Sequence, residues 1–399
     1  MIELDEIREA APFAECEQWG SLTGQANSFS VAMRYDDIVT ISKSPDNFRS
    51  GQGSVSIQDL PAEANEFFGS FINMDNPRHQ RQRSIVARSF TPRDLANVFD
   101  LVERVADEVI DEFCETGEVD LVEVLSQPFP LRIICDMMGI PKSEFGAVLK
   151  ATNIILGAGD PDFFEGGDPV VETLGAGALL ADLMNELAED RRSSPTNDLT
   201  SQLVHGVDGG ETLAEHELAP FFILLATAGN DTTRNAITHG LNLLHLYPEQ
   251  RQIWQNDPAN VTKTAVEEIV RYSSPVTFMR RTATRDVTVN GRAFSEGDKV
   301  VMLYGAANRD PRQFDDPATF DVLREQNPHL GFGGPGPHFC LGANLARREL
   351  GVIFERLFTR LPDIEVTGPA VPLNATVLPL VSGVKSLPVS FTPTAPVLN

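Results

Sequence analysis

The segment that most constrains how this chain can fold is rich in glycine and proline and runs directly into a helical pattern. It covers residues 329–348, HLGFGGPGPHFCLGANLARR, and holds five glycines and two prolines between Gly331 and Gly342. Glycine adopts backbone angles closed to other residues, and proline fixes φ and removes an N–H donor, so no regular helix or strand is expected there. Apolar residues then recur at helical spacing from Leu341 to Leu361. The segment is therefore predicted to be a stiff loop that ends at a helix N-terminus.

A single cysteine, Cys340, lies near the end of this loop. Backbone N–H groups at a helix N-terminus stabilise a thiolate and lower the pKa of the thiol. No second cysteine or histidine follows at chelating distance, so the sulfur suits a metal whose other ligands come from elsewhere. A haem iron with an axial cysteine fits that description. Gly336 and Gly342 would allow a large flat group to approach the backbone near the sulfur.

Three other interpretations of Cys340 compete with a metal ligand. A lone cysteine at a helix start is most often a small buried core residue. A nucleophile would need histidine and asparagine partners, and no such pattern of known spacing surrounds Cys340. Residues 331–336 also spell the dinucleotide fingerprint GxGxxG, which requires a preceding buried strand. Residues 321–330, DVLREQNPHL, are charged and broken by a proline, so this last interpretation is rejected.

Composition narrows the class of protein. The chain has 399 residues and no linker, repeat or low-complexity run, so residues 1–399 are predicted to form a single domain. A net charge of −25 argues against nucleic acid and anionic membrane surfaces. The four cysteines show no paired spacing, the N-terminus lacks a signal-peptide core, and the longest apolar run is far below the roughly 20 residues that span a bilayer. A cytoplasmic location is predicted.

A long helix is predicted over Glu215–Leu246, preceded by a possible capping box at Thr212–Glu215. Its centre, Ala228–Thr233 (AGNDTT), breaks the propensity rules, because glycine and adjacent threonines weaken a mid-helix. One interpretation is a helix end at Gly229 followed by a new helix. The other is a distortion in which Thr232 bonds back to the carbonyl four residues earlier and opens a groove.

Two charge patterns carry little information alone. Five arginines and no acid lie between Asn76 and Arg93, and His79 and Arg83 share one helix face; a solvated helix face is the commoner explanation. Glu268 and Arg271 are spaced as an ordinary helix ion pair.

In chain order, these motifs resemble the cytochrome P450 superfamily over roughly residues 30–390. The Cys loop matches the haem-binding signature of that family at Phe332, Gly336, His338, Cys340, Gly342 and Ala346. Phe332 lies eight residues before the cysteine, whereas the usual spacing is seven. The longer spacing and the sequence AGNDTTRNAITHG both resemble the actinobacterial branch that oxidises steroids and methyl-branched lipids.

The resemblance implies a mostly α fold with a small β-rich lobe (α+β), the latter mainly residues 25–60, 275–305 and 375–392, with residues 381–391 as a hairpin. Haem b would lie between the long helix and the Cys-loop helix, with Cys340 as the iron ligand. The other haem-binding residues would be His79, Arg83, Ala228, Gly229, Arg281, Phe332, Gly333, His338, Gly342 and Ala346. Arg280 is a rival to Arg281 for the propionate. Glu268, Arg271 and Arg324 would clamp the loop beneath the haem.

The resemblance further implies a monooxygenase in which Asp231 and Thr232 supply protons. Electrons would come from NAD(P)H through a ferredoxin reductase and an acidic ferredoxin, which would dock on an outward basic patch of Arg78, Arg81 and Arg88. The substrate would be a lipophilic molecule such as a steroid, terpenoid or branched lipid. The residues expected to line its pocket are Phe67, Phe71, Leu225, Val276, Phe278 and Val381. The rival classes are a haem-thiolate enzyme without oxygen insertion, such as a peroxide-driven oxidase or an isomerase, and a non-catalytic haem-binding protein.

Overall fold

A computed structural model describes residues 2–18, 27–90, 92–157, 160–164, 166–374 and 379–398. Most of these residues are helical, and the predicted α+β class is confirmed. The helices are α1 (Ile2–Ala10), α2 (Tyr35–Ser42), α3 (Ala62–Gly69), α4 (Arg78–Ala87), α5 (Pro92–Asp111), α6 (Pro128–Met138), α7 (Phe145–Leu156), α8 (Pro169–Ser193), α9 (Leu199–His205), α10 (Glu215–Leu246), α11 (Pro248–Asn256), α12 (Pro258–Ser273), α13 (Tyr304–Ala307) and α14 (Ala343–Arg360).

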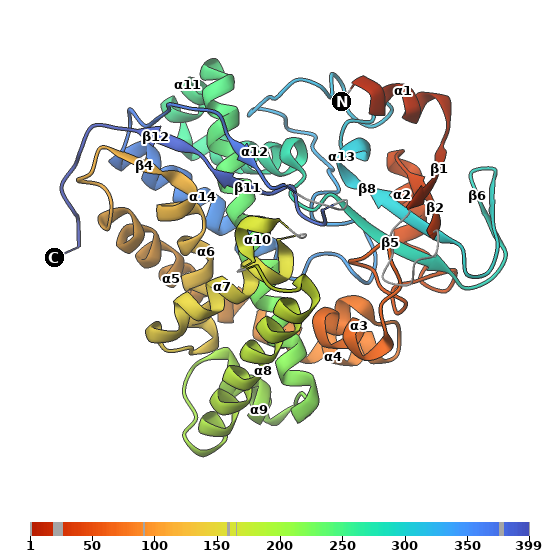
Figure 1. Ribbon diagram of the computed structural model, residues 1–399. Helices are drawn as coiled ribbons and strands as arrows, with labels where there is room; N and C mark the ends of the chain where they lie inside the picture. The colour runs from red at the N-terminus through yellow and green to blue at the C-terminus, as the bar shows by residue number, and fades with distance from the viewer. Residues whose placement is uncertain are drawn as a thin grey trace.

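A five-stranded sheet lies at one side of the helices, with the order β1-β2-β8-β5-β3 (Figure 1). Its strands are β1 (Phe13–Gln18), β2 (Asn27–Ala32), β8 (Lys299–Leu303), β5 (Phe278–Ala283) and β3 (Phe48–Arg49). Next to it, β6 (Val287–Val289) and β7 (Arg292–Phe294) form a hairpin through Asn290 and Gly291. Both turn residues have positive φ, 46° and 86°, as a two-residue Asn-Gly turn requires.

The remaining strands form small separate pairings. β11 (Val384–Ser386) pairs with β10 (Val371–Pro372), and β12 (Pro388–Ser390) pairs with β4 (Glu118–Asp120) and β9 (Glu365–Val366). The expected hairpin over residues 381–391 is therefore wrong. Only one residue separates β11 from β12, which is too short for the two-residue turn that a hairpin needs. Residues 25–26 and 375–378 of the predicted β-rich lobe lie outside the described residues.

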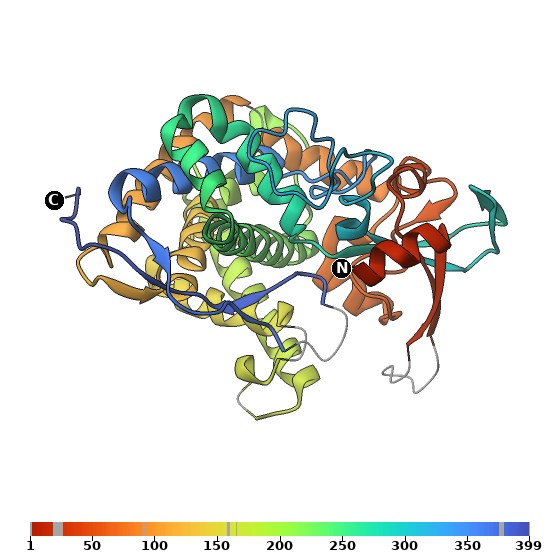
Figure 2. The same cartoon turned by 90° about the horizontal axis from the view of Figure 1, so that it is seen from above.

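The helix α10 runs through the middle of the molecule, and Figure 2 views it almost along its axis with other helices packed around it. It spans the predicted residues and stays α-helical through Gly229 and Thr232. The predicted capping box is wrong at this helix start. Instead, the Glu217 carboxylate accepts the N–H of Ala214 at 2.8 Å, and the same carboxylate binds Arg81.

Two apolar cores meet at α10. Its first half, including Leu218–Ala226, belongs to a core shared with α6, α7 and α8. Its last half, including Ala236–Leu244, belongs to a core shared with α5, α12 and α14. The intervening turns carry the polar residues, and they border a cavity rather than a core. Among the described residues, no helix has both the length and the hydrophobicity of a membrane span.

Candidate active site

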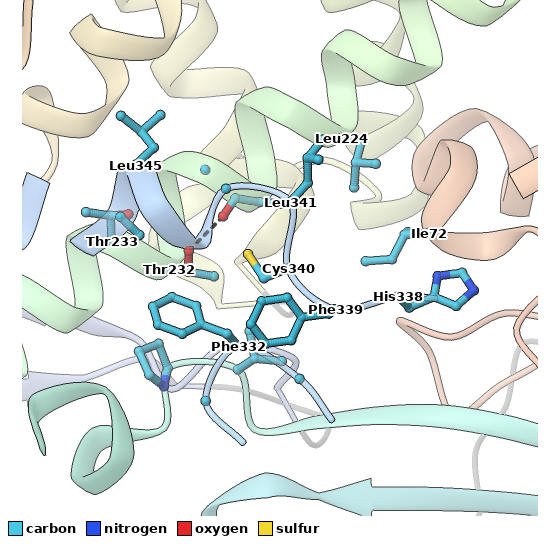
Figure 3. A pocket seen from close by; sticks show the side chains of 18 of the residues that line it. Ile72, Leu224, Thr232, Thr233, Phe332, His338, Phe339, Cys340, Leu341 and Leu345 are labelled. Atoms are coloured by element: carbon cyan, nitrogen blue, oxygen red, sulfur yellow. Dashed lines mark hydrogen bonds between the residues drawn. The ribbon is translucent and has the colours of Figure 1, made fainter. Parts of the chain in front are cut away.

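One cavity lies between the centre of α10 and the Cys loop (Figure 3). Cys340 lines it from the loop, and Thr232 lines it from α10. Figure 3 shows the rings of Phe332 and Phe339 beside the Cys340 sulfur. Residues that were predicted from motifs far apart in the sequence are thus brought to one site.

The Cys loop is tightly packed where its glycines lie. A Cβ on Gly334 would lie 2.3 Å from Ser42 Oγ, and one on Gly336 would lie 2.3 Å from the Ser42 carbonyl oxygen. Gly336 also has a φ of 155°, and Gly333 one of 85°. Gly334 and Gly336 need glycine because α2 contacts the loop backbone directly, and Gly333 needs it because of its positive φ. Gly342 differs from them, because a Cβ there would meet no described atom within 4 Å and would lie next to the cavity.

Cys340 is accessible, but the surface that it exposes faces the cavity rather than the outside of the molecule. Its N–H donates to the Phe332 carbonyl at 3.0 Å, which fixes the backbone of the loop across its width. Burial raises the pKa of the thiol, while the N–H of Gly342 and the charges of Arg83 and Arg347 act in the opposite direction. The site therefore offers a sulfur with several groups that favour the thiolate.

A cluster of nitrogen-bearing side chains lies beside the loop. The rings of His79, on α4, and His338 are 4.0 Å apart, and His338 contacts Ser50 Oγ at 3.2 Å. Arg83 donates to the Phe339 carbonyl at 2.5 Å. Burial lowers the pKa of His338 to about 2 and that of His79 to about 4. Both imidazoles are therefore neutral at pH 7.

Arg281 is the buried member of this cluster. Its Nη1 donates to the Arg280 carbonyl at 2.8 Å, and no carboxylate among the described residues pairs with it. Burial lowers the pKa of Arg281. In the same cluster, Nε2 of His79 is buried without a hydrogen-bond partner among the described residues. Such groups are costly unless a partner of opposite charge satisfies them, so this cluster is built for an anionic group.

Strand β5 separates the two arginines that the sequence left as rivals. Arg281 and Met279 line the cavity, whereas Phe278 and Arg280 point to the other face of the strand. Arg280 donates to the Ile57 carbonyl and to the Asp59 carboxylate, both at 2.9 Å. The prediction that Phe278 lines the pocket is wrong, because successive strand residues face opposite sides.

The centre of α10 shows the expected back-bond. The Thr232 hydroxyl donates to the Ala228 carbonyl at 2.7 Å. Gly229 lines the cavity and also lets α10 pack closely, because a Cβ there would lie 2.6 Å from Ile134 of α6. Asp231 is 2% exposed and does not line the cavity; its carboxylate lies 3.6 Å from Arg234. Burial raises the pKa of Asp231, and Arg234 opposes this.

Sequence reasoning missed Glu349, which lies on α14 and lines the cavity. Its carboxylate accepts a hydrogen bond from Thr233 of α10, and burial raises its pKa to about 8. A signal was available: Glu349 falls between Leu345 and Leu350 on the apolar side of a predicted helix. An acid at such a position is unusual unless it has a partner or a function.

The predicted clamp is assembled as expected. Arg271 donates to both carboxylate oxygens of Glu268 at 2.7 Å, and Arg324 Nε lies 3.2 Å from the same carboxylate. Arg271 also donates to the carbonyls of Asn308, Pro317 and Thr319. Glu268 and Arg271 are fully buried, so loss of either would leave an uncompensated charge.

The predicted pocket residues divide into two groups. Phe71, Leu225 and Val276 line the cavity, together with Ile72, Leu224 and Met279, which were not predicted. Phe67 does not line it, and neither does Val381, which forms a bridge with Val276. Phe67 instead packs with Phe68 against Gly177 of α8.

The predicted basic patch is largely neutralised. Arg78 pairs with Glu66, and Arg81 pairs with Glu211 at 2.6 Å and with Glu217 at 2.8 Å. The acids come from α3 and from the start of α10, so their proximity could not be seen in the local sequence. Arg88 remains exposed.

Comparison with known proteins agrees with this geometry. Residues 175–362 match the family model described as cytochrome P450. The chain is 47% identical to the methyl-branched lipid omega-hydroxylase of Mycobacterium tuberculosis, over 92% of this chain and 84% of that protein. It is 33% identical to the steroid C26-monooxygenase of Mycolicibacterium smegmatis, over 98% and 90% of the two chains. The Mycobacterium marinum cytochrome P450 CYP268A2 in complex with pseudoionone superposes with a TM-score of 0.90 and 37% identity, covering 98% of this chain and 94% of that one.

Proposed function

Because the chain belongs to the cytochrome P450 family, we propose that Cys340 binds the iron of its haem b group and that Thr232 faces the opposite side of that group. The protein is a haem monooxygenase that hydroxylates lipophilic molecules. One observation carries the assignment of residues: the sulfur and the threonine, which come from distant parts of the chain, line the same cavity.

The residues present fit a haem. Two carboxylates of such a group would satisfy the unpaired Arg281 guanidinium and the buried Nε2 of His79, with Arg83 and His338 beside them. Gly342 leaves open space next to the sulfur. Phe332, Gly333 and Ala346 would contact the same side of the group, and Ala228 and Gly229 the other.

When bound, the haem would supply the oxygen-activating chemistry, and the Cys340 thiolate would favour that chemistry by donating electron density to the iron. Thr232 holds a proton at Oγ1, directed at the Ala228 carbonyl, and can transfer it only after exchanging that hydrogen bond for one into the cavity. Asp231 lies behind it as a buried carboxyl whose raised pKa lets it hold and return a proton. Glu349 holds a second proton at its carboxyl near pH 7, next to Thr233.

The substrate end of the cavity is apolar. Phe71, Ile72, Leu224, Leu225 and Val276 line it, and the cations among the lining residues, Arg83 and Arg281, belong to the anion-binding cluster, where the carboxylates of the haem would pair with them. A charged substrate group would therefore find no partner there and would remain at the entrance. We infer a lipid that enters with an apolar terminus first and is hydroxylated at that terminus, as the names of the omega-hydroxylase and the C26-monooxygenase describe for those relatives.

Electrons would arrive from NAD(P)H through a ferredoxin reductase and a ferredoxin. The expected docking patch is weakened by the pairing of Arg78 and Arg81 with acids of this chain, and Arg88 is its exposed cation that pairs with no carboxylate among the described residues. Attraction for a strongly acidic ferredoxin would therefore be modest.

The haem ligand is tested by the carbon monoxide spectrum of the reduced protein. The wild type should give the red-shifted Soret band of a thiolate-bound haem, and Cys340→Ser should lose it. Cys135→Ser is the matched control, because Cys135 is buried among α6 and α8 residues away from the cavity. Retention of the band in Cys340→Ser, or its loss in Cys135→Ser, would contradict the assignment.

The reaction is tested by turnover with a surrogate ferredoxin, its reductase and NADPH. A methyl-branched fatty acid and a sterol side chain should each be offered, and the products identified by mass spectrometry. Terminal hydroxylation supports the proposal. Turnover with hydrogen peroxide alone would instead favour a peroxide-driven oxidase.

A further inference from the structure

Two consecutive glutamates on α12 serve different partners. Glu268 binds Arg271 and Arg324, as described above. Glu267, one residue earlier, points to another side of the helix and binds His329 and Arg347. His329 precedes the Cys loop, and Arg347 lies on α14 after it, so Glu267 connects both ends of the loop.

The contacts of Glu267 are close and well defined. Its Oε1 accepts Arg347 Nε at 2.5 Å, and its Oε2 accepts Arg347 Nη2 at 3.0 Å. The same Oε2 lies 2.9 Å from His329 Nε2. Since His329 Nδ1 accepts the Gly331 N–H at 3.1 Å, Nε2 must carry the ring proton and donate it to Glu267. The His329 side chain is 2% exposed, whereas those of Glu267 and Arg347 are 21% and 35% exposed, so the network runs from the interior to the surface.

Glu267 stays ionised in this setting. Burial opposes ionisation of the carboxyl, but the hydrogen bonds from His329 and Arg347 outweigh it and lower its pKa to about 2. The network therefore holds one full negative charge against the positive charge of Arg347 at any pH where the enzyme works.

The network reaches the sulfur through Phe332. The Arg347 guanidinium carbon lies 4.4 Å from the centroid of the Phe332 ring, and the Phe332 carbonyl accepts the Cys340 N–H. The loop entry packs closely against α12, because a Cβ on Gly331 would lie 2.5 Å from Val270. The charges on Arg347 and Glu267 are thus held in fixed positions next to the ring that packs beside Cys340.

We propose that Glu267, His329 and Arg347 are positioning residues that hold a balanced pair of charges beside the Cys340 sulfur and thereby set the reduction potential of the haem iron. This proposal rests on the proposed function, in which Cys340 is the iron ligand. Reduction adds a negative charge to the iron–thiolate unit, so a nearby cation raises its potential and a nearby anion lowers it. The ion pair keeps the two effects nearly cancelled.

The proposal is tested by measuring the reduction potential of the purified haem protein and its variants. Glu267→Gln removes the anion and leaves Arg347 uncompensated, so the potential should shift to a more positive value. Arg347→Gln removes the cation and should shift it to a more negative value. The double variant should lie between them, near the wild type, and Arg347→Lys, which keeps the charge, should restore most of the wild-type potential.

Opposite signs separate this role from a merely structural one. Both single variants break the same ion pair, so loosening of the loop alone would move the potential in one direction in both. The matched control is the adjacent pair of Arg348 with Glu103 of α5, where Arg348 lies over the ring of Phe99 rather than over Phe332. Glu103→Gln and Arg348→Gln should leave the potential unchanged.

Shifts of the same sign in the two single variants, or no shift in either, would overturn the proposal. If Glu267→Gln does not fold with haem, Arg347→Gln and Arg347→Lys still test the proposal. Arg347→Gln should lower the reduction potential, and Arg347→Lys should not. A wild-type protein without the thiolate Soret band would instead refute the proposed function, which distinguishes the two failures.

Discussion

The carboxyl groups around the cavity differ in what they face. Asp231 is buried behind α10 with Arg234, whereas Glu349 faces the cavity and contacts Thr233. Burial raises the pKa of both. A carboxyl in direct contact with the cavity is therefore provided by α14, whereas the carboxyl of the α10 motif lies behind the cavity wall.

Glu349→Gln should stabilise the protein, and by more at higher pH. The folded-state pKa of about 8 exceeds the ordinary value of 4.5, so the folded state binds the proton more tightly than the unfolded state. The stability that this provides is fully present below about pH 4.5 and is lost as the pH rises towards 8. Glutamine removes that loss, which for this pKa difference is on the order of 4 kcal/mol at pH 8. Denaturant unfolding of the haem protein at pH 5 and pH 8 should show the difference, and an equal gain at both would contradict it.

Thr232→Ala should uncouple NADPH consumption from hydroxylation. Loss of the hydroxyl removes a proton-transfer group worth roughly 100-fold in rate, so less product and more hydrogen peroxide are expected. Thr238→Ala is the control, because its hydroxyl makes the same kind of back-bond, to the Arg234 carbonyl, away from the cavity. Product yield per NADPH should fall only in Thr232→Ala. Equal losses in both variants would point to a helix defect instead.

Among the elements, α8 and α3 approach each other closely at Gly177. The rings of Phe67 and Phe68 fit against Gly177, where a Cβ would lie 2.8 Å from either ring. The same segment presents Phe71 and Ile72 to the cavity. Gly177 therefore determines how closely α8 approaches the segment that carries Phe71 and Ile72, which forms part of the cavity wall.

Two identical substitutions on α8 should have opposite effects. Gly175→Ala meets no described atom within 4 Å and should stabilise the helix by about 0.5–1 kcal/mol. Gly177→Ala gains the same propensity but must push the rings of Phe67 and Phe68, at a cost of roughly 1–3 kcal/mol. Urea midpoints of the two variants should move in opposite directions from the wild type. A higher urea midpoint in both variants would mean that the Phe67 and Phe68 rings can move aside at little energetic cost.

Charge dominates at the scale of the whole molecule. The chain carries a net charge of −25, and arginines near the Cys-loop helix pair with acids of α5, including Arg356 with Asp107 and Arg348 with Glu103. Such pairs hold α14 against α5 but leave little positive field for a partner.

The rate of reduction by an acidic ferredoxin should therefore rise when salt is added at low ionic strength. Two negatively charged molecules repel each other, and added ions screen that repulsion. Stopped-flow measurement of the second-order rate constant against salt concentration checks this. A neutral chemical reductant should show little dependence and serves as the control. A rate that falls with salt would reveal a local cationic docking patch around Arg88.

The local sequence was sufficient for features that depend on nearby residues. The bounds of α10 match the prediction, Asn290 and Gly291 form a two-residue turn between β6 and β7, and Thr232 bonds to the Ala228 carbonyl. Each rests on backbone propensities or on side chains within four residues, which the sequence contains directly. The order of the motifs along the chain indicated the family. The resemblance to that family then predicted the clamp and the residues around Cys340.

Only the tertiary structure decided the remaining features of the site, because those features depend on which distant segments of the chain come into contact. Whether Phe278 or Met279 faces the cavity depends on how β5 lies against the helices. Glu211 and Glu217 neutralise Arg81 only because α10 starts beside α4. Glu267 reaches both ends of the Cys loop only in the folded protein. Propensity and spacing extend over a few residues, whereas burial, charge pairing and pKa arise from contacts across the fold.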